Sequence, residues 1–378
     1  MHKRLFIPGP VEVIEENLQR MATPMIGHRS KDFEAPYARL QPKLQQLFAT
    51  TAPVYIATSS STGLWEASVR CLVRNKCLVG MQGAFSDRWH NVAEVNGKDA
   101  DKLRVEWGQA ITPDMVDAAL SKGGYDAFLL VHNETSTGVM NPLEEIAELM
   151  RRKYSDMMFV IDAVSSLAAV PIDVDRLGID MLLAGTQKAI GLPPGIAVGH
   201  LSARGMERAV SMTNRGYYFD LVEMHKYHLK NQTHTTPSIS HIFALDHQMD
   251  RMLEEGLANR YARHRKMALY TRAWAMTHFE LFAPLEYASE SLTCIRNTRE
   301  IKIADLNAEL GKRGALISNG YGKIKDLTFR IAHMADHQYD EIVELLGWID
   351  EILGLPEDGR VAGEEAVAAG SNRAPVMA

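Results

Sequence analysis

The chain has 378 residues, too many for one typical hydrophobic core, so we expect about two domains. Its 41 Lys and Arg residues stand against 47 Asp and Glu residues, a net charge of -6 with no basic block, which argues against partners such as nucleic acid or a membrane surface. The three cysteines, Cys71, Cys77 and Cys294, lack C-x-x-C spacing, so we expect no disulfide framework, no zinc site and a reducing, cytoplasmic location. The start of the chain has no signal-peptide core, and no run has the length of a membrane span.

Short apolar runs alternate with amphipathic stretches between about residues 50 and 200. The runs that predict buried strands are residues 53–57, 76–80, 127–131, 157–162, 182–185 and 196–199. Residues 112–122 and 143–154 predict helices, and Pro113 and Pro142 mark their starts. This alternation predicts an α/β domain built around a mainly parallel sheet.

The pattern changes in the last third of the chain. A long helical stretch from about residue 237 to 279 is followed by strand–helix–strand segments at residues 291–296, 302–313 and 327–331. We expect these to form a second, smaller α+β domain. Residues 356–378 are rich in Gly, Ala, Glu and Pro without apolar periodicity, and predict a disordered tail.

Two of the predicted buried strands end close to a single charged residue. Asp162 closes one of them, and Lys188 follows the other. Ligands collect outside the carboxyl ends of parallel strands, so both side chains are expected to face one crevice. A lysine can form a Schiff base with an aldehyde cofactor, and a carboxylate can keep a pyridine nitrogen protonated, which is what pyridoxal phosphate (PLP) chemistry needs. Taken alone, the pair is also compatible with an ordinary salt bridge.

A turn rich in small hydroxyl residues, Thr58-Ser59-Ser60-Ser61-Thr62-Gly63, lies between a predicted strand and a helix-like stretch at residues 64–73. Backbone N–H groups, hydroxyl donors and the helix dipole favour a dianion at such a turn, so it is a candidate phosphate site. Plain N-capping by Ser or Thr explains the same residues when they are taken alone.

Several further motifs are spread along the chain. They are Pro8-Gly9-Pro10, Gly27-His28-Arg29-Ser30, Gln82-Gly83-Ala84-Phe85, His132-Asn133-Glu134-Thr135-Ser136-Thr137-Gly138, Asp162-Ala163-Val164-Ser165-Ser166 and Gln187-Lys188-Ala189 with Pro193-Pro194-Gly195. Together with the hydroxyl-rich turn, they resemble the class V PLP-dependent aminotransferases, and among these the alanine–glyoxylate and serine–pyruvate (serine–glyoxylate) group. The resemblance runs from about residue 5 to 355.

The resemblance implies an architecture and a cofactor. The fold would be the PLP-transferase fold type I, with a mainly parallel seven-stranded sheet in the large domain and a smaller C-terminal α+β domain. Residues 1–20 would form an N-terminal segment that contributes to the active site, residues 21–255 the large PLP-binding domain, and residues 256–355 the small domain. The cofactor would be pyridoxal 5'-phosphate, and no metal is expected.

The resemblance also implies roles around the cofactor ring. Lys188 would be the Schiff-base lysine, which also moves the proton at the α-carbon of the substrate. Asp162 would be the partner of the pyridine nitrogen. Phe85 would stack on one face of the ring, where the family often has Trp or Tyr. Val164 would pack against the other face, and Thr135 would lie near the phenolic oxygen.

Phosphate contacts are implied for Ser61, Thr62 and Gly63, for Gln187, and for Thr235 contributed by a neighbouring subunit. The active site would therefore lie at the interface of a homodimer.

Two further positions qualify this pattern. Relatives commonly carry a tyrosine three residues before the interface threonine, whereas this chain has Gln232, which implies fewer phosphate contacts across the interface. Arg330 matches the arginine that binds the substrate carboxylate, a task for which a bidentate guanidinium is suited.

The implied reaction is ping-pong transamination of a small amino acid, alanine or serine, with glyoxylate or pyruvate. Phosphoserine and 2-aminoethylphosphonate aminotransferases share the scaffold; each needs cations for a second anion, which His28, Arg29 or Arg215 could supply. A cysteine desulfurase is disfavoured because Cys294 lies in a strand-like run instead of a loop. A non-catalytic relative that serves as a structural subunit would usually lack the lysine, which is present here.

Overall fold

The structure is a computed structural model and describes residues 2–356, so residue 1 and nearly all of the segment predicted to be a disordered tail, residues 357–378, lie outside the described part. The larger of its sheets has seven strands in the order β2-β10-β9-β8-β5-β3-β4. Their bounds are β2 (Val54–Ala57), β3 (Lys76–Met81), β4 (Asp99–Arg104), β5 (Ala127–Val131), β8 (Met158–Asp162), β9 (Met181–Gly185) and β10 (Ala197–Leu201). Only β10 runs antiparallel to its neighbours, so the predicted mainly parallel sheet is confirmed.

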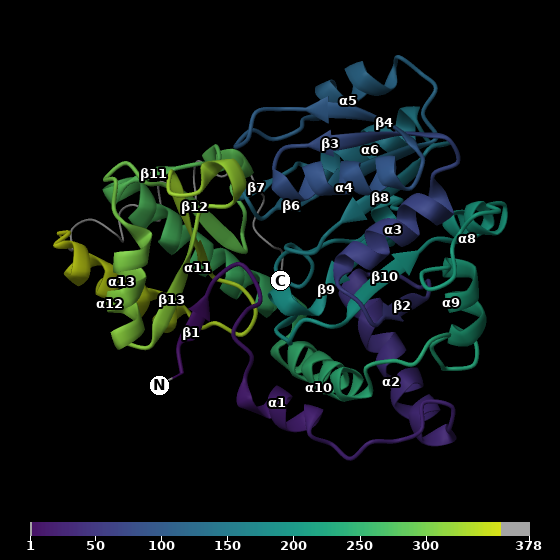
Figure 1. Cartoon of the computed structure of the whole chain (residues 1–378), viewed down its shortest axis with the longest axis horizontal. Coiled ribbons are helices and arrows are strands. Elements are labelled where there is room, and N and C mark those ends of the chain that lie inside the picture. Colours follow the sequence, from purple (N-terminus) through teal and green to yellow (C-terminus); the bar gives the residue numbers. More distant parts are fainter. Residues whose placement is uncertain (1, 357–378) are drawn as a thin grey trace.

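Helices cover both faces of this sheet (Figure 1). One face packs against α2 (Lys31–Phe48), α5 (Pro113–Leu120), α6 (Leu143–Lys153) and α10 (Ile239–Glu255). The other face packs against α3 (Ser61–Leu72), α4 (Ala84–Val95), α8 (Ala203–Val210) and α9 (Leu221–His228). Side chains of a strand alternate between its faces, so Phe128 and Leu130 of β5 enter the first core and Leu129 and Val131 enter the second. Burial on both faces explains why these strands are continuous apolar runs.

The strand of the large sheet that the sequence analysis missed is β4. Its sequence, Asp-Ala-Asp-Lys-Leu-Arg, is half-exposed or exposed throughout, because β4 pairs only with β3 and forms one edge of the sheet. Charged residues on an edge strand limit pairing with other chains, but they also remove the apolar run on which the prediction relied.

A five-stranded sheet in the order β1-β13-β14-β12-β11 lies beside the large one (Figure 1). Its strands are β1 (Arg4–Phe6), β11 (Glu280–Leu281), β12 (Leu292–Arg296), β13 (Ala315–Asn319) and β14 (Thr328–Ala332), and it packs with α11 (Leu257–His278), α12 (Ile303–Lys312) and α13 (Tyr339–Leu353). β1 and β13 are parallel, so residues at the start of the chain join the sheet formed by its last third. The predicted strands β12 and β14 and the helix between them are present, whereas β1, β11 and β13 were missed.

The long helical stretch predicted from about residue 237 to 279 consists of two helices, α10 and α11. Gly256 separates them with φ 81, a left-handed value that glycine adopts without strain. The break lies next to the domain boundary expected at residues 255/256; the division of the chain into domains stays a prediction.

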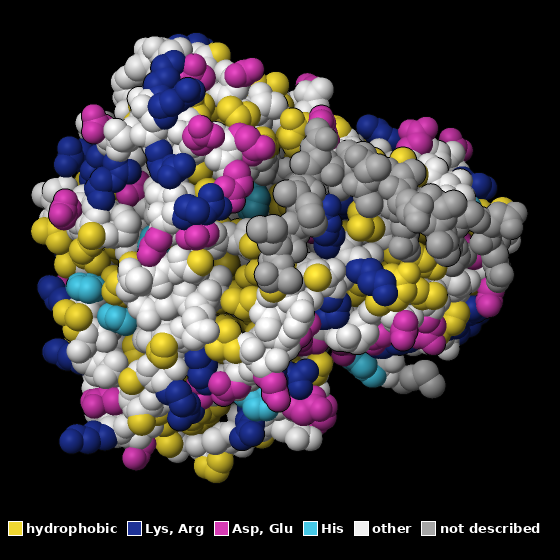
Figure 2. Space-filling view, turned by 180° about the vertical axis from the view of Figure 1, so that it is seen from behind, with side chains coloured by type: hydrophobic (Ala, Val, Ile, Leu, Met, Phe, Trp, Pro, Cys, Tyr) yellow, Lys and Arg dark blue, Asp and Glu magenta, His cyan; other side chains and the backbone are white. Residues whose placement is uncertain are grey.

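The remaining elements are short. They are α1 (Glu15–Met21), β6 (Asn133–Glu134), β7 (Val139–Met140), α7 (Val174–Leu177), η1 (Thr186–Ile190), η2 (Leu285–Tyr287) and η3 (Gly322–Ile324). Among residues 2–356, no helix combines the length and apolar character needed to cross a membrane. Acidic and basic side chains are interspersed over the face drawn in Figure 2.

Candidate active site

The carboxyl ends of β5, β8 and β9 bring the predicted catalytic residues to one edge of the large sheet. Asp162, the last residue of β8, pairs in register with Val131 of β5 and Leu183 of β9. Lys188 follows β9 by three residues, inside the short π-helical turn η1. Both side chains therefore start from the carboxyl ends of parallel strands, the side of an open α/β sheet on which ligands bind.

The turn that carries Lys188 is fixed from three segments of the chain. Lys188 itself has a non-helical backbone, with φ -118 and ψ -135. The carbonyl oxygen of Gln187 accepts a hydrogen bond from the Val11 N–H at 3.2 Å. The next carbonyls are bound by side chains: that of Ala189 by the Arg260 guanidinium at 2.8 Å, and that of Ile190 by the Gln248 amide at 2.7 Å.

The Pro8-Gly9-Pro10 motif packs directly on the Lys188 side chain. Nζ of Lys188 donates a hydrogen bond to the carbonyl oxygen of Pro8. A Cβ atom at Gly9 would lie 2.8 Å from Cδ and Cε of Lys188, and Gly9 has φ +114, so only glycine fits there. Burial of Lys188, together with the positive charge of Arg330, lowers the pKa of its amine to about 8, and a neutral, nucleophilic amine is therefore accessible near physiological pH.

Asp162 is buried and has both carboxylate oxygens bound. Oδ2 accepts from Nε1 of Trp65 at 2.8 Å, and Oδ1 accepts from the Val164 N–H at 2.7 Å. Burial raises the pKa of this carboxyl group to about 7, against the opposing effect of these hydrogen bonds. A cation placed beside Asp162, such as a protonated pyridine nitrogen, would favour the ionised carboxylate.

The hydroxyl-rich turn meets the Lys188 turn. Helix α3 begins at Ser61, so Ser61, Thr62 and Gly63 form its first turn instead of preceding it. A Cβ atom at Gly185 would clash with Oγ of Ser61 and lie 2.5 Å from Oε1 of Gln187, so both side chains converge on this glycine.

Within the described residues, the buried hydroxyl groups of Ser59 and Ser61 have no hydrogen-bond partner. Free hydroxyl donors at a helix N-terminus fit a phosphate group.

Phe85 is linked to the buried carboxylate of Glu134, the residue that precedes Thr135. Glu134 accepts hydrogen bonds from the backbone N–H groups of Phe85 and Ser86, which orients the start of α4. The Phe85 ring centroid is 5.8 Å from Nζ of Lys188. Oγ1 of Thr135 lies 2.5 Å from Oγ of Ser165.

Arg330 points from β14 of the small sheet toward the large one. Its guanidinium donates to the carbonyl oxygen of Thr135 at 3.2 Å and to Oγ of Ser318 at 2.9 Å. The residue is 6% exposed, and no ion pair joins it to a carboxylate in the described chain. Burial lowers the pKa of Arg330 from its usual value, and the group still remains a cation. A buried guanidinium without an acidic partner is suited to receive a carboxylate.

Thr235, the threonine expected to act from a neighbouring subunit, lies four residues before the start of α10. Its carbonyl oxygen accepts from Oγ1 of Thr233 at 2.7 Å, and no hydrogen bond within the described residues joins it to Ser61, Gln187 or Lys188.

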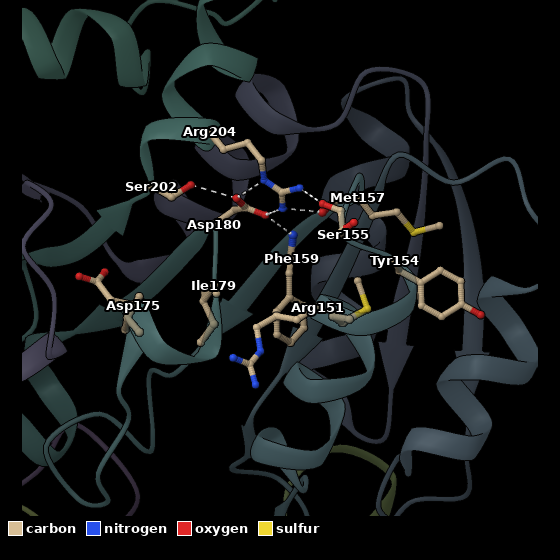
Figure 3. A pocket seen from close by; sticks show the side chains of 13 residues that line it. Arg151, Tyr154, Ser155, Met157, Phe159, Asp175, Ile179, Asp180, Ser202 and Arg204 are labelled. Carbon is tan, nitrogen blue, oxygen red and sulfur yellow. Dashed lines mark hydrogen bonds and ion pairs between the residues drawn. The ribbon is translucent and has the colours of Figure 1, made fainter.

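A separate cavity of about 380 Å³ lies at the opposite edge of the large sheet, where β8 and β9 begin (Figure 3). Asp180 there accepts from the Arg204 guanidinium, from Oγ of Ser202 at 2.9 Å and from the Phe159 N–H at 2.8 Å. The charge of Arg204 is thus balanced by Asp180, and the cavity is remote from the edge that holds Lys188.

Three residues at the site were missed by the sequence analysis: Trp65, Glu134 and Tyr321. Trp65 bonds Asp162, and the Tyr321 ring stacks on Phe85 with centroids 5.4 Å apart. Glu134 lay inside a quoted motif without a role. The only sequence signal for Tyr321 is its setting, an aromatic residue between two glycines in a loop.

Comparison with known proteins agrees with this geometry. Residues 12–326 match the family "Aminotransferase class-V". An uncharacterized aminotransferase of Methanocaldococcus jannaschii is 34% identical over 97% of this chain and 96% of its own length. L-aspartate–glyoxylate aminotransferase of Paracoccus denitrificans is 29% identical over 87% and 86%. The crystal structure of alanine–glyoxylate aminotransferase from Nostoc sp. superposes with a TM-score of 0.88 at 26% identity, covering 93% of this chain and 96% of that one.

The chain belongs to the class V aminotransferases. It is an aminotransferase with the PLP-transferase fold, and its cofactor is PLP.

The buried amine of Lys188 makes a testable contribution to stability. Its folded pKa, about 8, lies below the ordinary value of 10.5, so the unfolded chain binds more protons between these two pH values. For the cofactor-free protein, the free energy of unfolding relative to Lys188→Met should therefore rise with pH, by about 3 kcal/mol from pH 8 to 10.5. Urea unfolding across this range measures it.

The exposed Lys312, at the end of α12, supplies the matched control. The difference in free energy of unfolding between wild type and Lys312→Met should not rise with pH in this way. A difference between wild type and Lys188→Met that stays constant or falls as pH rises would contradict the shifted amine.

Proposed function

We propose that the protein transfers the amino group of a small amino acid, alanine or serine, to a 2-oxo acid, glyoxylate or pyruvate. The observation that carries this proposal is the pair of buried cationic groups, Lys188 and Arg330, on facing parts of one site. A substrate of this class presents an amino or oxo group and a carboxylate on adjacent carbons, which match an amine that can exchange with it and a guanidinium that can bind it.

The residues of the site divide the work. Bound PLP supplies an aldehyde that takes up the amino group and a ring that withdraws electrons from the substrate α-carbon. Lys188 holds the cofactor covalently and, once released, moves the proton at the α-carbon as a general base and acid. The Asp162 carboxylate keeps the pyridine nitrogen protonated, while Trp65 orients this carboxylate through its hydrogen bond. Arg330 binds and orients the substrate carboxylate.

Further residues hold the cofactor in place. Phe85 and Val164 would pack on the two faces of the ring, and Thr135 would lie at its phenolic oxygen. Ser61, Thr62, Gly63 and Gln187 would bind the phosphate, and the unbonded hydroxyl of Ser61 supports this assignment.

The names of two similar proteins support glyoxylate as the acceptor. One relative is named for transfer between L-aspartate and glyoxylate, and one solved structure for transfer between alanine and glyoxylate. Their names share the acceptor and differ in the donor. In the proposed ping-pong reaction, donor and acceptor occupy the same site in turn, so both would bind through Arg330.

A donor with a second anion, as in phosphoserine or 2-aminoethylphosphonate transamination, is supported less well. Arg215 is paired with Asp220 at 2.8 Å, which balances its charge. Arg29 donates to the carbonyl oxygens of Thr233 and His234 and lies 4.8 Å from the ring centroid of Tyr227.

A desulfurase activity through Cys294 is also supported poorly. The thiol lies in β12 and not in a loop, and burial raises its pKa to about 11, so it is a poor nucleophile.

We further propose a cytoplasmic homodimer in which Thr235 of one subunit reaches the phosphate site of the other. Among the described residues Thr235 makes no hydrogen bond to Ser61 or Gln187, which is consistent with contribution in trans. The buried, unpaired cysteines Cys71 and Cys77 support a reducing compartment.

The function is tested with a panel of donors against glyoxylate and pyruvate. Wild type should convert alanine or serine, and Arg330→Lys, which keeps the charge but loses the two-pronged geometry, should lower kcat/KM at least 100-fold, about 3 kcal/mol of binding in the transition state. Retention of the visible absorption band of the cofactor controls for cofactor loss. Turnover of phosphoserine in preference to alanine or serine, or an Arg330→Lys enzyme within a few-fold of wild type, would refute the assignment.

The dimer is tested by mixing two inactive variants. Lys188→Ala and Thr235→Val subunits should recover activity when refolded together, since one site of each heterodimer then contains both native residues. Recovery approaches a quarter of wild-type activity if subunits pair at random. If Thr235 serves its own subunit, every site carries a substitution and the mixture stays inactive.

A further inference from the structure

The connection between β13 and β14 brings to the site an aromatic side chain that has no role in the mechanism above. Tyr321 lies in this connection, two residues beyond the end of β13. Its ring stacks on Phe85 with centroids 5.4 Å apart and planes 23° apart. The Arg330 guanidinium carbon lies 5.5 Å from the centroid of the Tyr321 ring. Tyr321 therefore contacts both the aromatic residue beside Lys188 and the carboxylate receptor.

The loop that carries Tyr321 is tied to Arg330. The Asn319 carbonyl oxygen, at the base of the loop, accepts from Nε and Nη2 of Arg330 at 3.1 and 3.0 Å. The Asn319 side chain closes the loop by accepting from the Asp326 N–H at 3.0 Å. Nζ of Lys323 lies 4.7 Å from the ring centroid of Trp107, a residue that follows β4 of the large sheet. These contacts define where the Tyr321 ring stands relative to Arg330.

The ring is also pinned from the large sheet's side. Nη2 of Arg88, in α4, donates to the Tyr321 hydroxyl at 3.1 Å. The Arg88 guanidinium lies 5.4 Å from the centroid of the Phe85 ring, so one cation holds both aromatic residues. A stacked ring with its hydroxyl bound cannot rotate away without losing both contacts.

We propose that Tyr321 is a specificity-determining residue that limits the amino donor to small side chains; this inference rests on the proposed transamination. A donor has two fixed points, its carboxylate at Arg330 and its nitrogen at Lys188. Phe85 stands 5.8 Å from Nζ of Lys188 and Tyr321 stands 5.5 Å from Arg330, so the two stacked rings form a wall along the span between these points. A side chain of several carbons must displace the Tyr321 ring, whereas the methyl of alanine or the hydroxymethyl of serine does not.

The test compares kcat/KM for L-alanine, L-2-aminobutyrate and L-leucine, each with glyoxylate, in the holoenzyme. In Tyr321→Ala, the ratio of leucine to alanine should rise at least 10-fold over wild type, because each methylene accommodated in such a pocket changes discrimination about 10-fold or more. Tyr321→Leu, a less disruptive change, should shift the ratio in the same direction, and Tyr321→Phe, which keeps the ring, should leave it within about 3-fold. Leu327→Ala, at an exposed position of the same loop, is the control and should not change it.

Two failures are distinguishable. If wild type does not use alanine or serine, the proposed function fails. If wild type does use them but neither Tyr321→Ala nor Tyr321→Leu changes the ratio while both retain the cofactor band, the role assigned to Tyr321 is overturned.

Discussion

Burial of two positive charges without a paired carboxylate is the constraint around which this molecule is organised. Lys188 and Arg330 are 8% and 6% exposed, and no ion pair joins either to an acid in the described chain. A buried unpaired charge costs several kcal/mol, and the lowered pKa of Lys188 reflects part of that cost. The negative charges of Asp162 and Glu134 act against this lowering of the Lys188 pKa, but neither carboxylate forms an ion pair with Lys188, and Glu134 is held by backbone and hydroxyl donors. The two groups that carry this cost are the ones that would receive ligands: Arg330 the substrate carboxylate, and Lys188 the cofactor aldehyde.

The two sheets are held together through the same site. β1 pairs with β13 of the small sheet, and the chain then runs directly into Pro8, whose carbonyl oxygen binds Lys188. Arg260 of α11 joins Asp336, after β14, to the carbonyl group of Ala189. Any displacement of the small sheet therefore moves Arg330 and also acts on the Lys188 turn. The distance between these two residues, which would anchor the substrate, depends on how the two sheets are packed together.

The sequence was sufficient where local pattern and chemistry coincide. The apolar run that ends at Asp162 predicted both the strand and the position of the carboxylate, because a parallel strand buried on both faces leaves little freedom for its end. The same logic failed at β4, a polar edge strand, and at β1, whose three residues become a strand only by pairing with residues more than 300 positions away. Gly256 could have signalled the break between α10 and α11.

Contacts between segments that lie far apart in the chain could not be predicted from the sequence. Arg330 was found through a resemblance, since one arginine in a strand has no local pattern that marks it as a receptor. Tyr321 and Trp65 had no such help: their roles depend on packing between segments more than 90 residues apart, which periodicity and spacing do not encode. The start of α3 at Ser61 was missed by three residues because Ser, Thr and Gly serve equally in a turn and in a first helical turn.

The central claim is that Lys188 is the covalent attachment point of PLP, and reduction of the holoenzyme with borohydride followed by peptide mass mapping tests it most directly. The account predicts a single phosphopyridoxyl mass increment, on the peptide that contains Lys188, and its loss when a substrate amine has displaced the lysine before reduction. An increment on any other lysine, with Lys188 unmodified, would contradict it.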